Sequence, residues 1–369
     1  MAMKKMRQSN FELLRIISML MIVASHLASH GVQHQLDTDM AFKIWKTGPI
    51  LNKVVTSALI PGGGIGVGIF FMLTGYFQID KDKMSVRKVV LETVFYGWSI
   101  TLIYFFLRVA GFSSVAGSRV PMNTLLKTFL EPVGSGAWWF VTVYVIIMLV
   151  SPCLNYYLRK LNVKQFVRLV TLAWLFCYTA AYFVEASYAS LYRGVFFYIV
   201  GVFCKKVLTN KNISQCIYIG LSGLFWILGT ALYYVYGYAF LTEGMNAKLI
   251  LAICRTAYFA LVVPVCSVNI FKLFEKIDSR INKVINELAK SAFSVYLISD
   301  SGIVREFLWN DLLHVDSFWY FKKSFPLFCV VTILIIYAVC AFVDMLRIKY
   351  VEPKYLKATE KICNSLYKK

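Results

Sequence analysis

The sequence has few acidic residues, and it lacks the patterns of several common protein classes. Its 19 Asp and Glu stand against 39 Lys and Arg, which gives a net charge of +20. The nine cysteines lie mostly inside apolar runs without paired spacing, so they indicate neither a disulfide framework nor a metal site. We find no internal repeat, no low-complexity tract and no segment typical of a soluble catalytic domain. A disulfide-rich secreted protein and a repeat protein are therefore disfavoured.

Hydrophobic residues are in excess, because they make up 59% of the 369 residues and give a positive mean hydropathy. This composition lies outside that of soluble globular domains. We expect an all-α polytopic membrane protein with about ten transmembrane helices, since about 20 apolar residues cross a bilayer. We assign residues 1–348 to the transmembrane domain and 349–369 to a basic cytoplasmic tail that forms an interfacial helix. The expected spans are 11–29, 61–79, 88–110, 137–158, 165–184, 188–208, 213–238, 247–272, 287–308 and 321–347.

The distribution of the basic residues explains the net charge. Most of them lie in the N-terminal segment, in alternate connections between the spans and in the tail. Because cytoplasmic loops are enriched in Lys and Arg, this pattern places both termini in the cytoplasm and requires no nucleic-acid partner. The first apolar run is followed by "SHLASH", a poor cleavage site, so we expect an uncleaved first span in the cell membrane.

The first span, "NFELLRIISMLMIVASHLASH", carries three polar residues that need an explanation. Glu12, Arg15 and His26 lie in or near hydrocarbon, where an ionised side chain costs about 2.5–3.5 kcal/mol. On a helix, Arg15 and His26 lie within roughly 20° of the same face and about 16 Å apart along the axis. Glu12 is close enough to pair with Arg15. His26 can accept and return a proton near neutral pH, so it is a candidate for acid–base chemistry.

Structural roles and a transport role are alternatives for these residues. Arg15 can extend to the inner headgroups beside Glu12, and His26 can be a hydrogen-bonded packing residue. A secondary transporter or flippase could instead use Arg15 and His26 as an intramembrane proton-coupled pair. Internal repeats, which transporters usually show, are absent. We expect His30 and His34 in the loop after the first span.

The polar residues of the first span resemble the first-helix signature of the acyltransferase 3 family. In that integral-membrane family, an acidic residue, Leu and Arg precede a His at a fixed interval, and here these are Glu12, Leu14, Arg15 and His26.

Later segments resemble further motifs of the family, in the same order along nearly the whole chain. "FFMLTGYF" at 70–77 is similar to its second-helix motif, with Thr74 in place of Ser. "WWFVTVYVIIMLVSPCLN" at 138–155 and "FFYIVGVFCKK" at 196–206 are similar to two more. "SAFSVYLIS" at 291–299 matches a late motif up to its last residue.

Two departures from the family pattern concern possible substrate contacts. Ser299, followed by Asp300, stands where the family has a late His. The family's loop motif of two arginines is reduced to Arg87 and Lys88 here. The glycine-rich run at 61–77 lacks the Lys-Ser/Thr ending of a phosphate-binding loop, and it predicts close helix packing instead.

The resemblance implies a bacterial plasma-membrane enzyme that acylates polysaccharides. The donor would be cytosolic acyl-CoA, most often acetyl-CoA, and the acceptor a hydroxyl of a cell-surface or lipid-linked glycan. We expect no tightly bound cofactor and no metal, and membrane lipids as the surroundings. His26 would deprotonate the acceptor hydroxyl, or alternatively hold the acyl group transiently. Glu12 would orient Arg15, while Arg15, Tyr144 or Thr74 would donate to the developing oxyanion.

The remaining candidate residues would bind the substrates. Arg15, Arg87 and Lys88 suit the donor phosphates, although positive-inside sorting alone would also place the last two in the cytoplasm. We expect Glu92 to pair with Arg87 or Lys88.

The acceptor contacts also have structural alternatives. Trp139 suits a sugar-stacking wall or an interfacial aromatic belt. Arg193, Arg255 and Asp300 suit acceptor contacts, or else snorkelling and buried pairing. The full expected set of substrate-binding residues is Thr74, Tyr76, Trp139, Tyr144, Arg87, Lys88, Arg193, Arg255, Tyr296 and Asp300.

Overall fold

The computed structural model describes residues 8–33, 45–82, 85–111, 120–134, 138–180, 186–209, 213–240, 245–278 and 280–366, and these contain helices but no strand. The α-helices are α1 Ser9–His26, α3 Ile50–Leu59, α4 Pro61–Gln78, α5 Arg87–Val109, α6 Met122–Leu130, α7 Trp139–Lys160, α8 Val163–Ala180, α9 Ala186–Phe203, α10 Gln215–Phe240, α11 Met245–Ala257, α12 Val263–Glu275, α13 Lys283–Leu288, α14 Ala292–Ser299, α15 Val304–Glu306, α16 Phe325–Tyr350 and α17 Glu352–Leu366. Four π-helical segments, Leu27–Val32, Cys204–Leu208, Tyr258–Val262 and Phe307–Leu312, follow α1, α9, α11 and α15.

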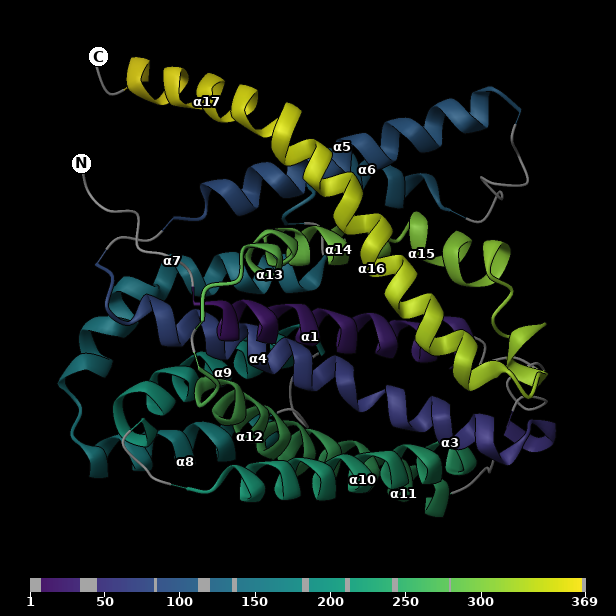
Figure 1. The fold of residues 1–369 in the computed structure, drawn as a ribbon, viewed down its shortest axis with the longest axis horizontal. Helices are drawn as coiled ribbons and strands as arrows, with labels where there is room; N and C mark the ends of the chain where they lie inside the picture. Colours follow the sequence, from purple (N-terminus) through teal and green to yellow (C-terminus); the bar gives the residue numbers. More distant parts are fainter. Residues whose placement is uncertain are drawn as a thin grey trace.

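The all-α membrane architecture expected from the sequence is confirmed. Within the described residues, seven helical stretches are long and apolar enough to cross a membrane. In Figure 1, α1 and α4 lie in the middle of the molecule, α10 and α11 along its lower edge, and α16 runs diagonally from the upper middle to the lower right. The count of about ten spans and the cytoplasmic location of both termini stay predictions.

The second span is longer than its apolar run. Helix α3 precedes α4 without a loop, and together they form a helical stretch from Ile50 to Gln78. The expected start at residue 61 was wrong because the first half carries polar residues. Lys53 is buried, and its Nζ donates to the Tyr238 hydroxyl at 2.9 Å. This partner on α10 compensates for burying the lysine.

The expected ninth span, 287–308, is not a continuous helix. It consists of α13, a short 3₁₀ turn, α14 and α15, with a break between Ser299 and Val304. The break contains Asp300, Ser301 and Gly302, and the amide of Ile303 donates to the Ser301 hydroxyl at 3.4 Å. Irregular backbone within a membrane protein is found where protein or a cavity surrounds it. The break therefore indicates a site.

Close helix packing, predicted from the glycine-rich run, is confirmed where α4 meets α9. A Cβ atom on Gly75 would overlap the Tyr198 carbonyl oxygen, and one on Gly201 would overlap the Met72 carbonyl oxygen. Small residues allow two backbones to approach this closely in a membrane. This contact fixes α9 against α4.

We expect Gly75→Ala to lower the stability of the protein, because the added methyl group forces α4 away from α9. Overpacking of this kind costs about 1–3 kcal/mol. The melting temperature of the purified protein in one detergent measures the effect. Gly220→Ala in α10 is the matched control, since nothing lies within 4 Å of its Cβ position. An equal melting temperature for both variants would contradict the tight contact.

Candidate active site

His26 and Asp300 meet where α1 ends and α14 breaks. The His26 Nδ1 atom lies 3.7 Å from Asp300 Oδ1, and the exposed fractions of these side chains are 16% and 7%. Asp300 reaches this position because the helix stops at Ser299 and the chain turns there. The carboxylate is thereby placed beside an imidazole from the first span, which the separation of the two residues in the sequence did not reveal.

Two further basic side chains surround Asp300. His30 Nε2 lies 3.6 Å and Arg305 Nη1 lies 3.5 Å from Asp300 Oδ1. The expected loop position of His30 was wrong, because α1 continues as a π-helical segment through Val32. His34 lies outside the described residues. The four-residue spacing of His26 and His30 would have indicated one helix face, whereas no sequence signal predicted Arg305.

A cavity of about 300 Å³ opens beside His26. Its walls come from α1, α4, α7, α9 and α14 and from the π-helical segment after α11, and they are mainly apolar and aromatic. Three of the expected substrate-binding residues line it together with His26, namely Trp139, Arg193 and Tyr296. Trp139 is 42% exposed, whereas its neighbour Trp138 is fully buried and lies outside the wall.

A second cavity adjoins the first and contains Arg255. Its volume is about 390 Å³, and its walls include Gln33 and Cys254. Several wall residues are shared between the two cavities, among them Tyr233, Tyr258 and Phe259. The expected acceptor contacts Arg193 and Arg255 therefore lie in neighbouring spaces with a common aromatic wall.

A second polar cluster lies near the other end of α1. Arg15 Nη1 donates to Glu12 Oε1 at 2.5 Å, so the predicted pairing is confirmed. The Tyr144 hydroxyl interacts with Thr74 and with the Arg15 charge. The Thr74 hydroxyl also donates to its own helix, at the Phe70 carbonyl. Four of the expected site residues thus lie at this depth and away from His26, namely Glu12, Arg15, Thr74 and Tyr144.

Tyr76 lines neither cavity. Its hydroxyl donates to Glu275 Oε1 at 2.9 Å, and Lys205 lies over its ring. Glu275 also pairs with the buried Lys272. Tyr76 thus belongs to a polar contact between α4, α12 and the segment after α9.

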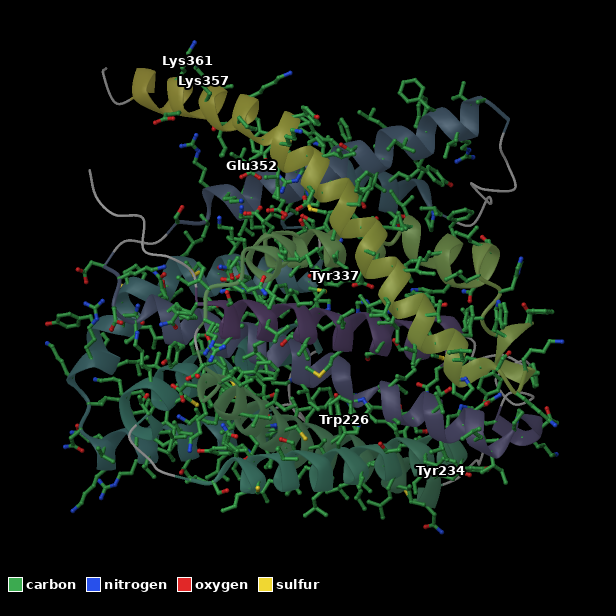
Figure 2. All side chains as sticks on the ribbon, in the orientation of Figure 1. Trp226, Tyr234, Tyr337, Glu352, Lys357 and Lys361 are labelled. Atoms are coloured by element: carbon green, nitrogen blue, oxygen red, sulfur yellow. The ribbon has the colours of Figure 1, made fainter. Side chains whose placement is uncertain are left out.

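Arg87 and Lys88 contact the C-terminal helix α17. Arg87 donates to the Leu356 carbonyl and to the Thr359 hydroxyl, and Lys88 Nζ lies 2.8 Å from Glu352. Figure 2 shows Glu352 where α16 meets α17, with Lys357 and Lys361 farther along α17. In the proposed donor-binding role, these two basic residues would share their charge with this helix.

Glu92 pairs with Arg347, so its expected pairing with Arg87 or Lys88 was wrong. The Arg347 guanidinium lies 3.4 Å from Glu92, 2.6 Å from Asp344 and 2.9 Å from Glu352. The Arg347 side chain is 2% exposed. Burial raises the pKa of Tyr355 in α17 to about 12, so this phenol stays neutral when it accepts a hydrogen bond from Arg347. A buried cation thus joins α5, α16 and α17.

The cluster around Asp300 also contains ligand types that a metal ion uses. His26, His30 and Asp300 offer two imidazole nitrogens and a carboxylate oxygen, all within 4.8 Å of one another. Zinc binds such sets. Arg305, however, competes for the same carboxylate oxygen. We retain the expectation that the site uses no metal.

A model of the acyltransferase 3 family, described as an acyltransferase domain, matches residues 8–344. The chain belongs to this family. Its helices and the family together identify a multi-pass membrane acyltransferase. Comparison with curated proteins and with solved structures gives no match.

The motif residues of this acyltransferase lie at two depths along α1. One group faces the cavity of His26, and the other surrounds Arg15. Ser299, which replaces the family's late His, donates to the Val295 carbonyl at 2.7 Å and lies outside the cavity wall. The adjacent Asp300 contacts the basic side chains instead.

We expect Arg347→Ala to destabilise the acyltransferase by about 3–5 kcal/mol, because it leaves buried carboxylates without their cation. Lys349→Ala is the control, since Lys349 is exposed near the end of the same helix. Folded yield and melting temperature in detergent measure the effect. If Arg347→Ala and Lys349→Ala behave alike, the network does not hold α17 in place.

Proposed function

We propose that this acyltransferase moves an acyl group, most often acetyl, from cytosolic acyl-CoA to a hydroxyl of a cell-surface or lipid-linked glycan. The membrane would be a bacterial plasma membrane. The observation that carries the proposal is the contact of His26 with Asp300 at the wall of a cavity large enough for a sugar ring. A base held by a carboxylate beside an open space fits proton transfer from a bound hydroxyl.

In the proposed reaction, His26 takes the proton of the acceptor hydroxyl. The hydroxyl oxygen forms a bond to the acyl carbon, the bond between that carbon and the CoA sulfur breaks, and the proton passes from His26 to the departing thiolate. Asp300 is a positioning residue, because it lies on the Nδ1 side of His26 and stabilises the imidazolium that forms. Their separation of 3.7 Å is longer than a hydrogen bond, and such contacts often shorten when substrate binds.

Arg15 serves the donor in this proposal. It lies about 16 Å from His26 along the helix axis, too far to touch an oxyanion formed beside His26. Its partner Glu12 holds the guanidinium in place, and Tyr144 and Thr74 are polar groups at the same depth. Arginine suits phosphate because its planar guanidinium donates two parallel hydrogen bonds. The oxyanion donor would then come from a cavity residue, for which Tyr296 lies beside His26.

We expect His26→Ala to reduce glycan acylation by about 10²–10⁴-fold, because it removes the proton acceptor. The assay follows label from acetyl-CoA into glycan in membranes with and without the protein. His314→Asn is the control: His314 is exposed and has a φ of 47°, a conformation that Asn tolerates. Full acylation by an inserted His26→Ala protein would overturn the base role, and transport without acylation would favour the transporter alternative.

We expect Asp300→Asn to lower kcat by at least about tenfold, because it removes the charge that stabilises the imidazolium. KM for acetyl-CoA should change little, since Asp300 does not contact the donor in this proposal. Asp300→Glu should restore part of kcat. Ser299→Ala is the neighbouring control, as its hydroxyl bonds only to its own helix. A loss confined to protein yield would mean that Asp300 is structural.

A further inference from the structure

Arg193 lies in the wall of the His26 cavity, and the described residues give it no acidic partner. Its Nε donates to the Ala189 carbonyl at 3.1 Å, and its guanidinium carbon lies 4.0 Å from the centre of the Phe259 ring. No carboxylate of the described residues lies within 4.0 Å of its nitrogens. Its electrostatic neighbours include Tyr178, Tyr258 and a second cation, Arg255.

Several other partly or fully buried cations in the described residues have carboxylate partners, whereas the buried Lys53 donates to the Tyr238 hydroxyl. Arg15 pairs with Glu12, Lys272 with Glu275, and Arg347 with several carboxylates. A cation in a low-dielectric interior is costly unless a counterion compensates it. Two cations near one another add repulsion. The surroundings of the half-buried Arg193 therefore complement an anion that the described residues do not supply, and the more exposed Arg255 adds positive charge beside it.

The two arginines are placed to act on one ligand. Arg193 lines the first cavity and Arg255 the second, and both cavities share the wall formed by Tyr233, Tyr258 and Phe259. The ring of Phe259 holds one face of the Arg193 guanidinium, which leaves its Nη groups for hydrogen bonds. Carboxylate and phosphate match such a guanidinium through paired hydrogen bonds.

We propose that Arg193 and Arg255 form a subsite for an anionic group, carboxylate or phosphate, carried by the acceptor saccharide. The identity of the ligand as acceptor rests on the proposed function, whereas the anion preference rests on the two arginines. Because Arg193 and His26 line the same cavity, an anion bound by Arg193 anchors the saccharide with its hydroxyls toward the base. The acceptor is then an acidic sugar or a sugar phosphate rather than a neutral glycan.

Three octyl glycosides that differ in one substituent test the subsite by binding. Octyl β-D-glucuronide carries a carboxylate, octyl β-D-glucoside 6-phosphate a phosphate, and octyl β-D-glucoside no charge. The melting temperature of the purified protein is measured against the concentration of each glycoside. We expect at least one anionic glycoside to bind the wild-type protein about tenfold more tightly than the neutral one, as one charge-assisted pair would give. The preferred anion distinguishes an acidic sugar from a sugar phosphate.

We expect Arg193→Gln and Arg255→Gln to remove this preference while leaving the weak binding of the neutral glycoside. Arg168→Gln is the control, since Arg168 is exposed on α8 and lines neither cavity. Equal binding of all three glycosides, or a preference that survives both substitutions, would overturn the subsite. A lipid-headgroup site would also overturn the subsite. In that case phosphatidylglycerol vesicles would stabilise the wild-type protein more than phosphatidylcholine vesicles do, this effect would need Arg193, and the three glycosides would bind alike.

Acyl transfer from labelled acetyl-CoA to the same three glycosides separates this inference from the proposed function. Arginine-dependent binding without transfer to any glycoside or to membrane glycan would contradict the acyltransfer proposal and leave the anion subsite in place. If Arg193→Gln instead lowers acyl transfer equally for charged and neutral glycosides, the result would contradict the subsite and leave the acyltransfer proposal in place.

Discussion

The part of the site around His26 depends on the carboxylate of Asp300. Its Oδ1 atom lies within 3.5–3.7 Å of His26, His30 and Arg305, which come from two helical segments far apart in the sequence. An ionised carboxylate in a largely apolar interior is costly unless basic groups surround it. These groups supply that compensation, and in return they are held at the wall of the cavity. The break after α14 is what allows the carboxylate to reach them.

The first span distributes its polar residues according to depth. Glu12 and Arg15 pair with each other near one end, whereas His26 lies near the other end with its carboxylate partner at the break after α14. Because both residues of this pair lie on one helix, the pair can form whichever helices pack against α1. The His26 contact exists only when α14 is correctly packed against α1. The position of His26, the proposed base, therefore depends on the tertiary fold, whereas the position of Arg15 depends on its own helix.

The sequence was sufficient for features that depend on local pattern. Apolar runs predicted most helices, and the three-residue spacing predicted the bond between Glu12 and Arg15. Features that depend on long-range pairing were missed. Hydropathy could not show the break at Asp300, because apolar residues flank it, and Glu92 was assigned to sequence neighbours although its partner Arg347 lies on another helix. Lys53 obscured the start of the second span because its compensating partner, Tyr238, is distant in sequence.

The paired and unpaired cations of this protein differ in what a ligand can gain from them. Arg347 is fully compensated by its own carboxylates, so an external anion would have to displace them and would gain little. Among the described residues, an aromatic ring and a backbone carbonyl contact the Arg193 guanidinium, and they offset part of the cost of its burial. An incoming anion therefore offsets the remaining free-energy cost of burying the Arg193 charge. Under the proposed subsite, the same electrostatic rule that makes Arg347 a structural residue makes Arg193 a binding residue, and the difference lies in whether the described residues supply the negative charge.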